Sequence, residues 1–272
     1  MNKQVPSSGR HAPVLDSRIF KTGNPQADFI QMKVLTDLGT SLGDVKADKT
    51  RQNRRKYCAA QLRKRPANKS GQDFTNAYVT WFFKSVKENH ALRDFLAGKL
   101  SGQTVVDLGC GSSSSVEIAL KMMEMFGASK YVAVDLSPSV WSAKLIEKAN
   151  MKGEIEAALV REDMVLFAAS LKDSSVNFLI SGIDDSTLCD KEPRTVSRRD
   201  WYGIEHIHWR WKALASDIAR ATVQGGIVFG NDRSAIGNYI EKLRQPFANF
   251  FPSKDKDLCA DICIDPYSYV KA

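Results

Sequence analysis

A short glycine turn between two apolar runs carries residues whose types and spacing suit the binding of a nucleoside. The turn Gly109–Ser113 follows the run Thr104–Leu108, and Asp135 ends the next apolar run. Glycine admits backbone conformations that are closed to other residues and lets a ligand approach without a Cβ in the way. A carboxylate at the end of the next strand can accept two hydrogen bonds from a ribose diol. We therefore expect Asp135 to bind the sugar of a nucleoside held at this turn.

The residues around the turn predict one β-α-β unit. Thr104–Leu108 and Tyr131–Val134 are short runs rich in β-branched and apolar residues, which is typical of buried strands. Between them, Val116, Ala119, Leu120 and Met123 recur at helical spacing. Parallel strands joined by a helix form the nucleotide-binding half of a doubly wound sheet. The first turn of such a helix offers unpaired N–H groups and a positive dipole end to a ligand.

The glycine spacing disfavours a dinucleotide. The dinucleotide fingerprint Gly-x-Gly-x-x-Gly would place its last glycine at position 114, where this chain has Ser114. The string Val105–Ser112 (VVDLGCGS) instead resembles motif I of class I S-adenosylmethionine (SAM) methyltransferases, and Val134–Ser137 (VDLS) resembles their ribose-binding motif. The alternative is a doubly wound domain that binds another nucleotide, or none.

The resemblance implies SAM as the cofactor and indicates which residues bind it. In the family, the acid matched by Asp107 holds the amino end of the methionine moiety, directly or through water. An acid after the third strand, matched by Asp163, accepts a hydrogen bond from the adenine amino group, with Met164 beside the ring. The alternative role of Asp163 is a helix cap. The cofactor-binding residues predicted in this way are Asp107, Gly109, Gly111, Ser112, Asp135, Leu136, Asp163, Met164 and Ser181.

The acceptor site is expected after the fourth predicted strand, Ser175–Ile180. Ligands of open α/β sheets bind at the carboxyl ends of the strands, and the resemblance implies that Ser181–Asp185 is the catalytic position. The Asn/Asp-Pro-Pro-aromatic motif of nucleobase amino-group methyltransferases is absent there, as is a cysteine nucleophile. A base is needed only if the acceptor must lose a proton. The candidate catalytic residues are Asp184, Tyr202 and His206; a histidine here can equally be a surface or capping residue.

Two segments are predicted to shape the substrate side. The charged insert Asp185–Gly203 exceeds the length of an ordinary loop, and such loops are usually functional lids or disordered. The stretch Phe74–Leu96 predicts a helix with a wide apolar face. In the family, a helix at this place often lies over the substrate mouth, and Tyr78 and Trp81 would then line the active site. Ordinary packing against the sheet is the alternative.

The remaining elements are expected to complete the fold. Ala27–Leu38 predicts a helix with Phe29 on its apolar side, and Ser137 predicts a helix N-cap with Pro138 next and Trp141 on the apolar face. The family implies an α/β fold, doubly wound, with a mostly parallel seven-stranded sheet and helices on both faces. Its further strands are expected at Ile155–Val160, Ile227–Gly230, Leu258–Ile264 and Tyr267–Lys271.

The excess positive charge lies in the first quarter of the chain. Residues 1–70 hold 15 lysines and arginines against 5 acids, whereas the whole chain has a net charge of +8. The predicted helix Thr50–Arg65 and the residues up to Lys69 contain bases and no acid. We therefore divide the chain into a basic N-terminal extension, residues 1–70, partly disordered or helical, and a methyltransferase domain, residues 71–272. The extension can contact RNA phosphates, or it can be a solvated surface.

The composition narrows the class of protein. No apolar run approaches the roughly 20 residues of a membrane-spanning helix. Met1–Pro13 lacks the apolar segment of a secretory signal, and the five cysteines form no CxxC pair. We expect a cytoplasmic methyltransferase with no membrane and no metal partner. A small-molecule acceptor is slightly favoured, RNA is the alternative acceptor, and a non-catalytic module of the same fold is a third possibility. The sequence leaves the oligomeric state open.

Overall fold

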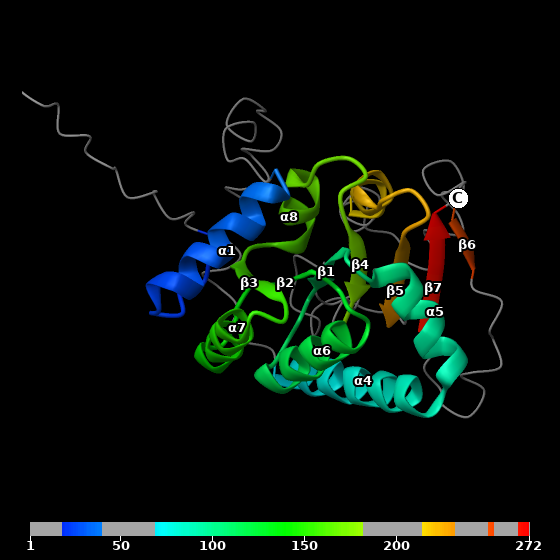
Figure 1. The fold of residues 1–272 in the computed structure, drawn as a ribbon, viewed down its shortest axis with the longest axis horizontal. Coiled ribbons are helices and arrows are strands. Elements are labelled where there is room, and N and C mark those ends of the chain that lie inside the picture. Colours follow the sequence, from blue (N-terminus) through cyan, green and yellow to red (C-terminus); the bar gives the residue numbers. More distant parts are fainter. Residues whose placement is uncertain (1–17, 40–68, 182–213, 232–249, 253–265, 272) are drawn as a thin grey trace, which may run out of the picture.

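The computed structural model describes residues 18–39, 69–181, 214–231, 250–252 and 266–271, which are built around one sheet (Figure 1). Within these residues the strand order is β3-β2-β1-β4-β5-β7-β6. The first five strands run parallel, and β7 and β6 are antiparallel to their neighbours. The strands are β1 Thr104–Leu108, β2 Lys130–Asp135, β3 Glu156–Arg161, β4 Asn177–Ile180, β5 Ile227–Asn231, β6 Phe250–Pro252 and β7 Pro266–Lys271.

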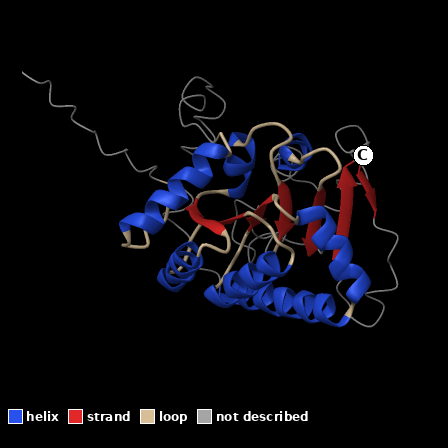
Figure 2. Cartoon of the chain, in the orientation of Figure 1, coloured by secondary structure: helices blue, strands red, loops and turns tan. Residues whose placement is uncertain are grey.

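Helices cover both faces of the sheet, which confirms the predicted α/β class with a parallel sheet (Figure 2). One face packs against α4, α5, α6 and α7, and the other packs against α1, α8 and a helical stretch at residues 214–221. The helices are α1 Pro25–Asp37, α4 Lys69–Glu88, α5 His90–Leu100, α6 Ser113–Met125, α7 Val140–Lys152 and α8 Met164–Ser170.

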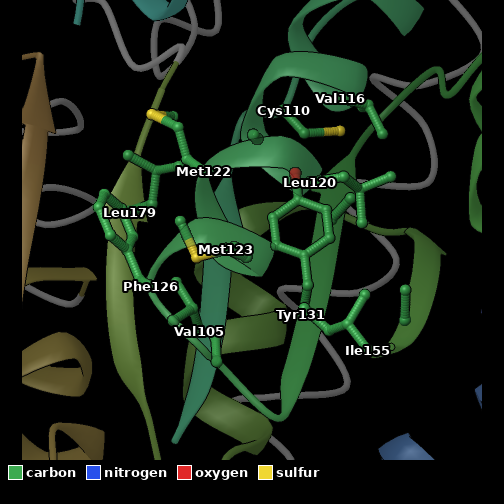
Figure 3. Close-up of a cluster of buried hydrophobic side chains, with 14 of the residues drawn as sticks. Val105, Cys110, Val116, Leu120, Met122, Met123, Phe126, Tyr131, Ile155 and Leu179 are labelled. Carbon is green, nitrogen blue, oxygen red and sulfur yellow. The ribbon is translucent and has the colours of Figure 1, made fainter. Parts of the chain in front are cut away.

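Alternate residues of each strand enter opposite cores. Val105 and Tyr131 pack with the helices α4 to α7, whereas Val106 and Val132 pack with α1 and α8. Figure 3 shows part of the first core, with Tyr131 among the methionines and Phe126 of the α6 region. Because both faces of these strands are buried, their sequences are apolar at nearly every position rather than at alternate ones.

The segment that contains α1 closes the outer edge of β3. The Phe20 N–H donates to the Leu159 carbonyl at 2.9 Å, and Gln31 Oε1 accepts from the Leu159 N–H at 2.9 Å. Asn150 of α7 bonds the N–H and the carbonyl of Ala157 at 2.7 and 2.9 Å. These bonds take the place of a further strand, so the backbone groups at this edge are not left exposed for pairing with another chain.

The helix predicted for Phe74–Leu96 is two helices. Asn89 separates α4 from α5 with an extended backbone, and its side chain accepts from the Leu92 N–H at 2.9 Å. Asparagine is a preferred N-cap residue, and this bond satisfies one of the free donors of the new helix. The apolar periodicity continues across Asn89, which is why the pattern alone did not reveal the break.

Three other local predictions are wrong. The N-cap of α7 is Ser139, two residues after the predicted Ser137, and its Oγ accepts from the Ser142 N–H at 2.9 Å. Trp141 is 67% exposed and Phe29 is 58% exposed, so neither belongs to the buried face of its helix. In α1 the buried face includes Asp28 and Gln31, polar residues that hydrogen bonds satisfy.

Some predicted elements cannot be compared with the structure. The strand Leu258–Ile264 and the basic helix Thr50–Arg65 lie outside the described residues. The last predicted strand, Tyr267–Lys271, coincides with β7. Among the helices that the structure describes, none has the length and apolar character needed to cross a membrane.

Candidate functional site

The candidate site lies where the strand order reverses between β1 and β4. The chain continues from β1 to β2 and β3 on one side, and to β4 and β5 on the other. Leu108, the last residue of β1, is paired with Val134 of β2 and with Ile180 of β4. The residues that follow these three strands therefore meet at one edge of the sheet. Such a switch point is the usual ligand-binding position in open α/β sheets.

The glycine turn after β1 adopts the conformation that its sequence predicts. Gly109 and Gly111 have φ angles of 72° and 69°, in the left-handed region that favours glycine. The N–H groups of Gly109 and Cys110 both donate to the Val134 carbonyl, at 3.0 and 3.2 Å. A Cβ built on Gly111 would lie 2.9 Å from Cγ2 of Thr75, which belongs to α4. The turn is therefore held by β2 on one side and closely approached by α4 on the other.

Asp135 contacts this turn directly. Its Oδ2 accepts from the Gly111 N–H at 3.0 Å, and its Oδ1 accepts from the Ser137 N–H at 2.8 Å. Burial raises the pKa of Asp135, while the backbone donors at Ser137, Gly111 and Leu136 lower it. A carboxylate has about four acceptor positions, so these two bonds leave capacity for a ligand. The structure thus brings the strand-end acid and the glycine turn together.

Asp107 lies beneath the turn and is fully buried. The Tyr131 hydroxyl donates to its Oδ2 at 2.7 Å. Within the described part of the chain, Asp107 Oδ1 and Ser181 Oγ are buried without a hydrogen-bond partner. Burial raises the pKa of Asp107 to about 7; the nearby Ser181 and the Tyr131 hydroxyl lower it, and the charge of Asp135 raises it. Ser181 therefore lies close to this carboxyl, although the two free oxygens do not meet the geometry of a hydrogen bond.

These two oxygens and the turn meet the requirements of a nucleoside ligand with an amino group. Buried polar atoms are nearly always hydrogen-bonded, so two neighbouring buried oxygens without partners point to a polar group of a ligand. The ionised carboxylate of Asp107 accepts only, and an ammonium group supplies both the donors and the opposite charge. Gly111 is required by the turn itself, because a side chain there would collide with Thr75 of α4.

Two further predicted residues act as helix caps. Ser112 Oγ accepts from the Ser115 N–H at 3.4 Å at the start of α6. Asp163 Oδ1 accepts from the Val165 N–H at 2.9 Å at the start of α8, which is the alternative role considered for it. Asp163 and Met164 are buried and follow β3 at the same edge of the sheet as Asp135. Their contact with adenine stays a prediction.

Several predicted residues lie outside the described parts of the chain. They include the insert Asp185–Gly203 and all three catalytic candidates, Asp184, Tyr202 and His206. The side chains of Tyr78 and Trp81 on α4 are likewise not described. Among the described residues, no group of three or more His, Cys, Asp or Glu side chains could hold a metal ion.

The sequence prediction assigned no part in the site to Tyr131 and Thr75. A tyrosine inside a buried strand is a usable signal, because a buried phenol hydroxyl needs a hydrogen-bond partner. The partner itself was not predictable, because it depends on the register between β1 and β2. Nothing in the sequence marks Thr75, whose contact with Gly111 depends on how α4 crosses the turn.

Comparison with known proteins gives distant structural likenesses only. No protein-family model and no curated protein matches the chain. A protein of Clostridium thermocellum described as an rRNA methylase aligns with 66% of this chain and 92% of its own, at 12% identity and a TM-score of 0.42. A protein of Streptococcus mutans assigned as a methyltransferase, solved with SAH, aligns with 67% of this chain and 97% of its own, at 12% identity and a TM-score of 0.41.

A third structure, a geranyl diphosphate methyltransferase solved with SAM, aligns with 67% of this chain and 85% of its own, at 12% identity and a TM-score of 0.36. At TM-scores below 0.5 these likenesses carry no argument about what the chain does.

Proposed function

We propose that this chain is a class I SAM-dependent methyltransferase and that the switch-point site binds the cofactor. One observation carries the proposal: the glycine turn, Asp135 and the buried acid Asp107 lie together at the carboxyl ends of β1 and β2. These are the residues whose sequence resembles the two cofactor-binding motifs of that family. The order of the parallel strands places them at the switch point of the sheet.

Each residue of the site has a proposed role in binding. Asp135 accepts hydrogen bonds from the ribose hydroxyls, and Gly109 and Gly111 admit the ligand beside the backbone. Asp107 Oδ1 and Ser181 Oγ take the amino end of the methionine moiety. The remaining proposed contacts, at the adenine and along the turn, are made by Asp163, Met164, Leu136 and Ser112.

SAM, when bound, supplies a methyl group on a sulfonium that is already a good leaving group. The chain must therefore orient the acceptor and keep water away, and proton transfer is needed only if the acceptor carries a proton on the attacked atom. Asp184, Tyr202 and His206 remain the candidates for that transfer, since they belong to the segment that follows β4.

A small molecule is the favoured acceptor, with the insert Asp185–Gly203 and α4 as the proposed recognition surface. RNA is the second candidate because the residues from Arg51 to Lys69 contain bases and no acid. The third candidate is a module that binds SAM and transfers nothing.

Isothermal titration calorimetry with SAM and with NAD tests the cofactor proposal. We expect the wild-type protein to bind SAM and not NAD. Asp135→Ala should weaken SAM binding about 10- to 100-fold, because hydrogen bonds to a charged group contribute about 1.5–3 kcal/mol. Asp94→Asn is the matched control, since Asp94 is an exposed acid on α5 and its replacement should leave the affinity unchanged. Binding of NAD at the same site, or an unaffected Asp135→Ala variant, would refute the assignment.

Incubation with labelled SAM and fractionated cell extract tests the acceptor. We expect the label to enter the small-molecule fraction. Label in the RNA fraction would show that RNA, the second candidate, is the acceptor. If the protein binds SAM by calorimetry but no fraction becomes labelled, the result would favour the third candidate, a module that binds SAM and transfers nothing.

A further inference from the structure

Tyr131 makes a contact inside the cofactor site that the proposed function does not use. Its side chain is fully buried in β2, and its hydroxyl donates to Asp107 Oδ2 at 2.7 Å. Val105 is paired with Tyr131, and Asp107 is paired with Ala133, so all four side chains lie on the same face of the sheet. The phenol ring extends along β2 from its own register position and reaches the carboxyl of Asp107 diagonally, with its hydroxyl toward the end of the sheet where Cys110 lies (Figure 3).

We propose that Tyr131 is a positioning residue of the cofactor site: its hydroxyl holds Asp107 by Oδ2, so that Oδ1 remains available to the amino end of the cofactor. This inference rests on the proposed function, because it concerns the same site. The two oxygens of Asp107 have different surroundings, since one accepts from Tyr131 and the other has no partner among the described residues.

The same bond favours the ionised form of Asp107. Burial is the largest influence and raises its pKa to about 7, while Ser181 and the Tyr131 hydroxyl act in the opposite direction. Among the described residues, two other titratable groups interact with this carboxyl, and both are acids: Asp135 on β2 raises its pKa, and the buried thiol of Cys110 interacts with it electrostatically. Loss of the Tyr131 hydroxyl should therefore leave more of Asp107 neutral at pH 7.

Tyr131 itself stays a donor over the useful pH range. Burial and the neighbouring Asp107 raise its pKa well above that of a free tyrosine. The phenol therefore stays protonated at neutral and mildly alkaline pH, where Asp107 ionises, and the hydrogen bond can persist there. A serine or threonine at this position would not reach across the strands, so the length of the ring matters as well as its hydroxyl.

The test compares two ligands in wild type and in Tyr131→Phe, which keeps the ring and removes the hydroxyl. S-Adenosylhomocysteine carries the amino acid end, whereas 5′-methylthioadenosine keeps the adenosine and the sulfur and lacks that end. We measure the Kd of both by calorimetry from pH 6.5 to 8.5. Tyr131→Phe should weaken S-adenosylhomocysteine about tenfold at pH 7, an effect typical of one hydrogen bond to a charged group, and leave 5′-methylthioadenosine unchanged.

The pH dependence separates an effect that acts through the Asp107 carboxyl from a general loss of packing. The deficit of Tyr131→Phe should shrink as pH rises toward 8.5, because Asp107 then ionises in the variant too. A variant that binds S-adenosylhomocysteine as wild type does at every pH, or that loses both ligands equally, overturns the inference and leaves the cofactor assignment standing. A wild-type protein that binds neither ligand overturns the cofactor assignment, and this inference with it.

Discussion

At the scale of single residues, Asp107 combines a proposed role in cofactor binding with a cost in stability. Its carboxyl is fully buried, and burial raises its pKa from 3.8 to about 7. Between these values the folded protein holds a proton that the unfolded chain releases, so the stability of the protein decreases as pH rises from about 4 to 7. A pKa difference of this size corresponds to about 4 kcal/mol. Buried acids with strongly raised pKa values are common at functional sites, although their burial lowers the stability of the fold.

Replacing Asp107 by asparagine should remove that penalty. We expect Asp107→Asn to raise the free energy of unfolding by up to about 4 kcal/mol at pH 8 and to change it little at pH 4. Urea denaturation at the two pH values measures this difference. Asp94→Asn serves as the control, because it makes the same replacement at an exposed acid on α5. A variant with the pH dependence of the wild type would show that Asp107 does not titrate in this range.

Gly111 provides a second test at the residue scale. Gly111→Ala must adopt a positive φ and bring Cβ to within 2.9 Å of Thr75 Cγ2, so we expect a loss of about 2–4 kcal/mol in stability by urea denaturation. Gly153→Ala is the matched control: Gly153 has a φ of 74° and open space around it, and its replacement should cost only about 1 kcal/mol. Thr75→Ser in the Gly111→Ala background removes Cγ2 and should recover part of the loss. Equal losses for the two glycines, with no recovery, would exclude the contact with Thr75.

At the scale of elements, α1 acts as the edge cover of the sheet. Its buried face is partly polar because Gln31 bonds the Leu159 N–H of β3, the edge strand of the sheet within the described residues. Asp28 on the same face accepts from Thr22 and from Gln31. An amphipathic pattern of apolar residues cannot identify such a helix, because hydrogen bonds to a strand, and not apolar contacts alone, define the face that it buries.

Gln31→Leu tests this function of α1. The substitution leaves the Leu159 N–H buried without an acceptor, and we expect the free energy of unfolding to fall by about 1–3 kcal/mol. Gln26→Leu, the same replacement at an exposed position of the same helix, should stay within about 0.5 kcal/mol of wild type. Urea denaturation measures both. If the two variants unfold alike, α1 does not stabilise the edge of the sheet through Gln31.

At the scale of the whole molecule, the uneven charge is the property that bears on the acceptor. Residues 1–70 hold 15 bases and 5 acids, although the whole chain has a net charge of only +8. A protein that binds RNA through many phosphate contacts loses affinity for the RNA steeply as the salt concentration increases, because counterions are released on binding.

With a small molecule as the acceptor, we expect RNA binding to be weak and nonspecific. Fluorescence anisotropy with labelled RNA from 50 to 300 mM salt should give no saturable binding at physiological ionic strength. A variant with Arg54, Arg55 and Lys56 replaced by glutamine is the control for residual attraction at low salt. Saturable binding that this variant loses would favour RNA as the acceptor.

Most of the parallel fold and part of the site could be predicted from local sequence. The unit from β1 to β2 is continuous in the chain, so the glycine turn, α6 and Asp135 follow from short-range patterns. The break at Asn89 was missed because the apolar spacing of α4 continues into α5. The cap at Ser139 was not predicted because Ser137 and Ser139 both offer a hydroxyl just before the helical spacing, and local sequence does not distinguish them.

The sequence alone determined which residues form the turn and the strand-end acid, because glycine conformation, strand propensity and helix spacing act over neighbouring residues. The tertiary structure decided how Tyr131 meets Asp107, how Thr75 meets Gly111, and how α1 covers β3. Each of these contacts joins elements that are distant along the chain or depends on strand register. Register and helix crossing are set by packing of the whole core, and no short stretch of sequence contains that information.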